Sequence, residues 1–104
     1  MNLGCVVYKK SFDSGNLSAN WCFSFDGELL SGTGTATGQP GEDYVGEYVI
    51  TYYDASGAQR GTYNLLIEKN DSFYELKWFQ NKILKHSGIG MLEENSLVVS
   101  WKKV

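Results

Sequence analysis

Turn-forming residues recur along this chain at intervals of about 8 to 15 residues, and this spacing restricts its fold more than any other feature. The strongest of these signals is Asp26-Gly27, which lies between two runs of apolar and strand-forming residues. Because both central residues of a type I′ turn need a positive φ, Asp-Gly in this setting predicts a tight hairpin. The segments between the turns alternate in polarity rather than repeat every 3.6 residues, which disfavours helices.

Within these segments apolar residues alternate with polar ones. Leu97, Val99 and Trp101, for example, are separated by a valine and a serine, a period of two that is typical of a half-buried strand. The one stretch that could be helical is 87–94, and its two glycines disfavour a helix. We therefore predict an all-β protein with strands over 3–10, 20–25, 28–37, 43–53, 60–69, 73–79, 82–92 and 96–103.

With 104 residues the chain has the usual length of one domain, so we expect residues 1–104 to form a single β-barrel domain. Consecutive strands joined by tight turns fit an eight-stranded antiparallel up-and-down barrel, which leaves no unpaired edge. The alternative is a two-sheet β-sandwich. We favour the barrel because Greek-key sandwiches need long crossover connections, and no segment here is long enough for one.

The order of these elements resembles the calycin superfamily, which includes lipocalins, fatty-acid-binding proteins and avidins. The likeness extends over residues 44–103 and is closest to small bacterial barrel proteins. It is carried by Gly61-Thr62-Tyr63, by Tyr74-Glu75-Leu76-Lys77-Trp78, by Gly88-Ile89-Gly90 and by Asn95-Ser96-Leu97-Val98-Val99-Ser100-Trp101. The resemblance implies a calycin-like, lipocalin-like barrel that binds a small molecule.

Charge and hydropathy exclude several classes of partner. The net charge is −3, with 9 basic and 12 acidic residues, whereas a nucleic-acid partner calls for clustered Lys and Arg. No apolar run approaches the roughly 18 residues of a membrane span, so we expect no membrane partner. The first residues lack the basic and long apolar regions of a signal peptide, which predicts a cytoplasmic protein. Whether Cys5 and Cys22 form a disulfide stays open.

Two strand faces carry almost no side chains. In the segment 31–38, Gly32, Gly34 and Ala36 share one face, and Gly88 and Gly90 share a face further along the chain. Such a face either lets large neighbouring side chains pack against the backbone or leaves space for a ligand. Whether large neighbours fill these faces or leave space for a ligand depends on the side chains of the strands that face them.

Large aromatic side chains on the predicted strands are the candidates for the wall of a pocket. Trp and Tyr combine an apolar ring with one polar group, so they suit both a core and a pocket for an aromatic ligand. His86, the only histidine, would share a face with Leu84 and Gly88 under strict alternation and could be a polar anchor. The candidate ligand-binding residues are Trp21, Tyr48, Tyr63, Trp78, His86 and Trp101.

These residues predict a binding protein for a small apolar or aromatic ligand. One histidine and two distant cysteines do not supply the usual ligands of a zinc site, and we expect no metal or other cofactor. No catalytic motif is recognisable, and an enzyme would need a carboxylate beside His86. The alternative is a protein-interaction module that uses the outer sheet surface, in its simplest form a homodimer, because the segment 44–53 is rich in Tyr.

Overall fold

The structure, a computed structural model, describes residues 2–41 and 43–104 and is all-β in these residues. No helix in this described part is long and apolar enough to cross a membrane. The strands are β1 (Gly4–Lys10), β2 (Leu17–Phe25), β3 (Glu28–Thr37), β4 (Gly46–Asp54), β5 (Gln59–Asn70), β6 (Phe73–Gln80), β7 (Ile83–Glu93) and β8 (Ser96–Lys103).

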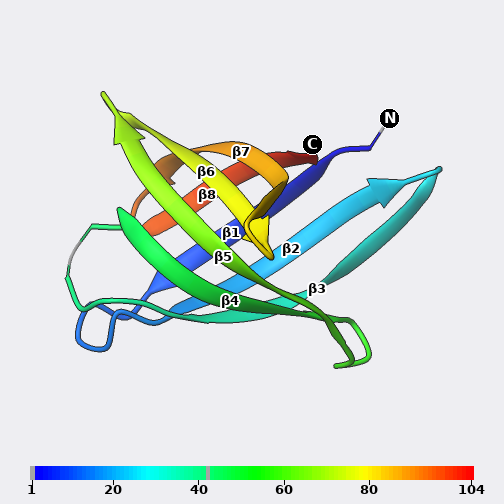
Figure 1. The fold of residues 1–104 in the computed structure, drawn as a ribbon, viewed down its shortest axis with the longest axis horizontal. Coiled ribbons are helices and arrows are strands. Elements are labelled where there is room, and N and C mark those ends of the chain that lie inside the picture. The colour runs from blue at the N-terminus through cyan, green and yellow to red at the C-terminus, as the bar shows by residue number, and fades with distance from the viewer. Residues whose placement is uncertain (1, 42) are drawn as a thin grey trace.

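The strands close into an antiparallel barrel in which each strand pairs with its neighbours in sequence (Figure 1). The last strand returns to the first: Gly4 of β1 lies opposite Trp101 of β8, and Tyr8 lies opposite Leu97. This closure confirms the up-and-down barrel, and the sandwich alternative is wrong. Because β1 pairs with both β2 and β8, the sheet has no free edge and does not divide into two layers.

The tight turns have the backbone that their residues predict. Asp26 has a φ of 49° and Gly27 a φ of 83°, so the β2–β3 hairpin has the two positive φ angles of a type I′ turn. One strand is longer than its pattern indicates. β2 begins at Leu17 rather than at residue 20, because Leu17 pairs with Lys10 on one side and Ala36 on the other.

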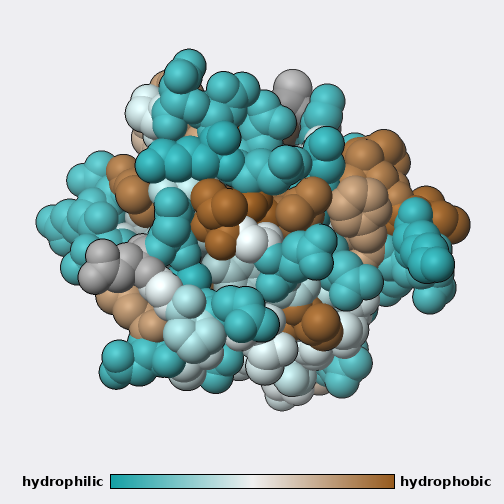
Figure 2. All heavy atoms as spheres, turned by 60° about the vertical axis from the view of Figure 1, so that its left-hand side comes forward, coloured by the Kyte–Doolittle hydropathy of each residue, from teal (hydrophilic) through white to brown (hydrophobic). Residues whose placement is uncertain are grey.

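Inward-pointing side chains of β1 to β6 and of β8 form one continuous core. Tyr8, Ile50, Ile67 and Leu97 have no exposed surface at all. Tyr44 and Tyr48 from the Tyr-rich segment are also buried in this core. Other large hydrophobic side chains stay outside, and Figure 2 shows a face on which they lie in patches among hydrophilic ones.

The faces without side chains make room for aromatic rings of the next strands. Trp101 pairs with Gly4 on one side and with Gly88 on the other, and an added Cβ at Gly88 would lie 3.1 Å from Cβ of Trp101. Tyr52 packs in the same way against Gly34, where an added Cβ would be 2.9 Å from Cδ1 of the tyrosine. Packing of large neighbours therefore explains both predicted faces over much of their length.

Candidate functional site

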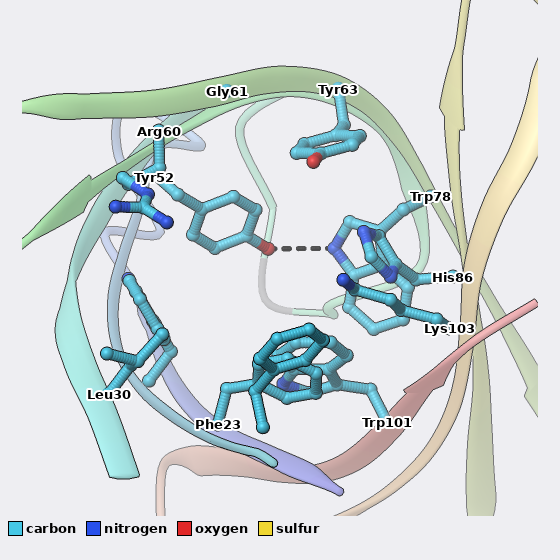
Figure 3. A pocket seen from close by; sticks show the side chains of 12 residues that line it. Phe23, Leu30, Tyr52, Arg60, Gly61, Tyr63, Trp78, His86, Trp101 and Lys103 are labelled. Carbon is cyan, nitrogen blue, oxygen red and sulfur yellow. Dashed lines mark hydrogen bonds between the residues drawn. The ribbon is translucent and has the colours of Figure 1, made fainter. Parts of the chain in front are cut away.

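A cavity of about 330 Å³ opens at one mouth of the barrel (Figure 3). The aromatic rings in Figure 3 surround an open centre, and all three tryptophans of the chain contribute to this wall. The lining residues are Trp21, Phe23, Phe25, Leu30, Tyr52, Arg60, Gly61, Tyr63, Trp78, His86, Trp101 and Lys103.

Two lining residues, Tyr52 and Trp78, form the floor of this cavity, and hydrogen bonds join them to the buried Tyr8. The indole N–H of Trp78 donates to the hydroxyl oxygen of Tyr52 at 2.7 Å, and that hydroxyl shares a second bond of 2.6 Å with the hydroxyl of Tyr8. Burial raises the pKa of Tyr8 and of Tyr52 well above the usual value for tyrosine. Both hydroxyls are therefore neutral, and this floor separates the cavity from the solid core beneath it.

The ring of His86 lies among three larger aromatic rings. Its centroid is 5.3 Å from that of Tyr63, 6.3 Å from that of Trp78 and 5.1 Å from that of Trp101, each in an edge-on arrangement. On the far side of Trp101, the ring of Phe23 stacks at 4.8 Å. These ring contacts hold the walls of the cavity against one another.

One ring nitrogen of His86 makes no hydrogen bond to the described residues. This atom, Nδ1, is buried. Burial lowers the pKa of His86, and the positive charges of Lys103 and Lys85 lower it further. The imidazole is therefore neutral at pH 7 and offers one donor and one acceptor. Buried polar groups normally have a partner, and a water or a ligand would supply the missing one here.

A β-bulge in β7 lies between Leu84 and His86. Trp78 of β6 pairs with His86, but Phe79 pairs with Leu84, so Lys85 is an extra residue in β7. Phe79 points outward because Trp78 points inward, and Leu84 opposite Phe79 lies on the outer side as well. The prediction that Leu84 shares a face with His86 is therefore wrong, since strict alternation does not hold across the bulge.

Two cationic side chains stand at the entrance. Lys103 Nζ lies 5.3 Å from the ring centroid of Phe23 and 5.1 Å from that of Phe25, which are cation–π distances. Arg60 enters from β5, with Nη1 3.7 Å from a carboxylate oxygen of Asp54. Among the described residues that line the cavity none is a carboxylate, so its mouth is positively charged.

Five of the six candidate residues meet in this cavity: Trp21, Tyr63, Trp78, His86 and Trp101. The sixth, Tyr48, does not line it. Tyr48 lies four residues before Tyr52 on β4, deeper in the barrel, where it is buried and its hydroxyl donates to the carbonyl of Tyr44 at 2.8 Å. Tyr48 is thus a core residue, and Tyr52 supplies the phenol that faces the cavity.

Sequence patterns could have identified several lining residues that we did not select. Phe23 alternates with Trp21, and Lys103 lies two residues after Trp101, so each shares the inward face of its neighbour. Arg60 gives no such signal. Tyr52 pairs with Gly61 and the next residue of β4 pairs with Gln59, which leaves Arg60 as the extra residue of a second bulge.

The chain was also compared with known proteins, and no family model, curated protein or solved structure matches it. Fold and site alone therefore define the class of protein. It is a closed, eight-stranded, up-and-down antiparallel barrel with a cavity lined mostly by aromatic residues at one mouth.

Proposed function

We propose that this protein binds a small aromatic or apolar molecule in the cavity at the barrel mouth. The observation that carries the proposal is a cavity that is lined mostly by aromatic side chains and whose histidine has a buried Nδ1 without a partner among the described residues. The calycin resemblance is part of this proposal, because it implies a barrel that binds a small molecule.

The size and chemistry of the cavity describe the ligand. Its volume of about 330 Å³ lies near the lower end of the range for small-molecule sites, roughly 300–1,000 Å³, which favours a compact ligand over a long lipid chain. Flat aromatic walls bind flat ligands best, because ring faces and edges then stay in contact over a large area. A planar aromatic compound fits these requirements.

Tryptophan fluorescence is a direct test of this proposal. The three tryptophans of the chain, Trp21, Trp78 and Trp101, all line the cavity, so a ligand bound there should change most of the indole emission. A library of aromatic and apolar compounds would first be screened by thermal shift. A ligand at 100 times its Kd adds about 2.7 kcal/mol to the free energy of unfolding, which corresponds to about 10 °C in Tm.

A pair of adjacent leucines provides a matched control for the position of the site. Leu30 pairs with the inward Phe23 and lines the cavity, whereas Leu29 is 77% exposed on the outside. Leu30→Trp should fill the space and weaken binding about tenfold or more, and Leu29→Trp should leave Kd unchanged. Equal effects of the two variants, or a library without hits, would contradict the proposal.

An exposed apolar groove favours a second candidate function, association with another copy of this chain. Phe73, Ile89, Met91 and Val98 line one shallow groove over β6, β7 and β8, and they are 54%, 67%, 51% and 39% exposed. An apolar patch is complementary to its own copy across a two-fold axis, so a homodimer is its simplest use. Light scattering across concentrations tests this: dimers that Met91→Lys abolishes support it, and a monomer throughout contradicts it.

A further inference from the structure

We propose that the ligand is an aromatic acid, whose ring enters the cavity and whose carboxylate lies at the mouth between Lys103 and Arg60. This inference rests on the proposed function and adds the charge of the ligand to it. The inference depends on the positions of Lys103 and Arg60, and on the hydrogen bonds of Asp54, the carboxylate that lies beside Arg60.

The ionised side chains at the mouth are positive, whereas the net charge of the chain is negative. Acidic residues outnumber basic ones by 12 to 9, yet both ionised side chains that line the cavity are basic. An aromatic cage alone would accept a neutral or a cationic ligand, since ring faces attract cations. Two fixed positive charges beside the rings disfavour a cation and attract an anion.

Lys103 is held where it can reach a ligand. It follows Trp101 on the inward face of β8 and pairs across the sheet with His86, so its stem rises from the cavity wall. The rings of Phe23 and Phe25 lie below its ammonium group at 5.3 and 5.1 Å. No acidic residue among the described ones forms an ion pair with Lys103, so its ammonium group is free to bind an anionic ligand.

Arg60 has spare hydrogen-bonding capacity although Asp54 lies close to it. Asp54 already accepts hydrogen bonds from the backbone N–H of Ser56 and of Ala58, both at 3.0 Å, and from the Ser56 hydroxyl at 2.6 Å. These three bonds all go to Oδ1 of Asp54, and Nη1 of Arg60 lies 3.7 Å from the other oxygen, Oδ2, which is beyond hydrogen-bond distance. The Arg60 side chain is 55% exposed, so most of its five donors are available to a carboxylate.

Both bulges of the barrel lie beside this mouth and add to its positive charge. The extra residue is Arg60 in β5 and Lys85 in β7, and each bulge adjoins a residue that lines the cavity, Gly61 and His86 respectively. Bulges commonly redirect side chains at the rims of barrels. Lys85 is exposed outside the cavity, where its charge extends the positive field without contacting the ligand.

Three naphthalene probes of different charge test the inference: naphthalene-2-carboxylate, its neutral and nearly isosteric amide, and the cationic 2-naphthylmethylammonium. Their Kd values would be measured by calorimetry and by tryptophan fluorescence on the full chain at low salt. We expect the carboxylate to bind about tenfold more tightly than the amide, and the ammonium compound to bind most weakly. Added salt should weaken binding of the carboxylate and leave that of the amide unchanged.

Adjacent lysines on β8 give a matched pair of variants with the same change of net charge. Lys103→Gln should weaken the carboxylate about tenfold and leave the amide unaffected, whereas Lys102→Gln, on the outer face, should change neither Kd. Arg60→Gln should weaken the carboxylate in the same way. A uniform loss for both probes would show that Lys103 acts by shaping the cavity, and it would overturn the inference.

The outcomes separate this inference from the function on which it rests. If the carboxylate and the amide bind with the same Kd, or if the amide binds more tightly, the ligand need not be an acid and only this inference fails. If no probe or library compound changes the tryptophan emission or Tm, the proposed function fails and this inference fails with it.

Discussion

The indole N–H of Trp78 on β6 donates a hydrogen bond of 2.7 Å to the phenolic oxygen of Tyr52 on β4, across the inside of the barrel (Figure 3). The same oxygen is bonded to the hydroxyl of Tyr8 on β1 at 2.6 Å. One atom thus joins three strands that are not neighbours in the sheet. This connection closes the bottom of the cavity and fixes the tilt of Trp78.

Removing that oxygen should weaken the whole barrel. In Tyr52→Phe the buried N–H of Trp78 and the hydroxyl of Tyr8 both lose their partner, and an unsatisfied buried polar group costs about 1–3 kcal/mol. We expect the free energy of unfolding to fall by about 2 kcal/mol in urea denaturation. Tyr53→Phe, at the next position, has no such bond to lose and should stay within about 0.5 kcal/mol of the parent.

The glycine beneath Trp101 should not tolerate even a methyl group. A Cβ at Gly88 would lie 2.5 Å from the carbonyl oxygen of Ser100, a backbone atom that cannot move without disturbing the sheet. Gly88→Ala should therefore lower the free energy of unfolding by about 1–3 kcal/mol. Ser87→Ala on the outer face is the control. Similar stability of the two variants would show that β7 and β8 can separate at little cost.

Alkaline pH should unfold the protein through its buried tyrosines. Burial raises the pKa of Tyr48 to about 12, and those of Tyr8 and Tyr52 are also raised well above the usual value near 10. Between pH 10 and the raised pKa values, the buried tyrosines keep their protons in the folded state but have lost them in the unfolded state. The free energy of unfolding should fall above pH 10, by about 1.4 kcal/mol per pH unit for each such tyrosine.

Thermal unfolding between pH 8 and pH 12 would measure this slope. Tyr8→Phe removes one of these groups, so its slope above pH 10 should be smaller than that of the parent, whatever the stability of the variant at neutral pH. An unchanged slope would mean that Tyr8 ionises as readily in the barrel as in the unfolded chain.

Mild acid should act through His86. Because the pKa of His86 is lowered in the folded state, the unfolded chain binds a proton near pH 6.5 while the folded protein does not. The free energy of unfolding should therefore fall as the pH drops below 6.5. His86→Gln cannot take up this proton, and its stability should change less between pH 6.5 and pH 5. Chemical denaturation at several pH values compares the two, and parallel curves would contradict the prediction.

Cys5 and Cys22 should form a disulfide when an oxidant is present. They are paired residues of β1 and β2, and their Sγ atoms are 3.0 Å apart. Exchange with glutathione disulfide would join the two sulfurs and release two reduced glutathione molecules. The bond closes a loop of a size that stabilises a protein by about 3 kcal/mol in the chain-entropy view.

Mass spectrometry and Tm before and after oxidation test this prediction. The hydrogen bond to Cys22, and to a smaller extent burial, raise the pKa of the Cys5 thiol, so the reaction should be faster at pH 9 than at pH 7. Cys22→Ser should yield only a mixed disulfide with glutathione. The same product in the parent chain would show that the two strands do not let the sulfurs approach.

Much of the fold could be predicted from the sequence because its signals are local. A positive φ at Asp26 and Gly27 depends on those two residues alone, and the alternation around Trp101 needs only the geometry of one strand. The candidate site was partly predictable for the same reason. Alternation marks the inward aromatic residues, and most of those selected line the cavity.

Only the tertiary structure shows that the sheet closes, how far each inward residue lies from the mouth of the barrel, and which charged side chains reach that mouth. Tyr48 and Tyr52 carry the same side chain on the same face, and only the position along the barrel makes one a core residue and the other a cavity residue. Arg60 reaches the mouth, and Leu84 lies on the outer face, because hydrogen bonding to the neighbouring strands slips by one residue at each bulge. A strand's own sequence sets its period, but the pairing with other strands sets where that period is broken.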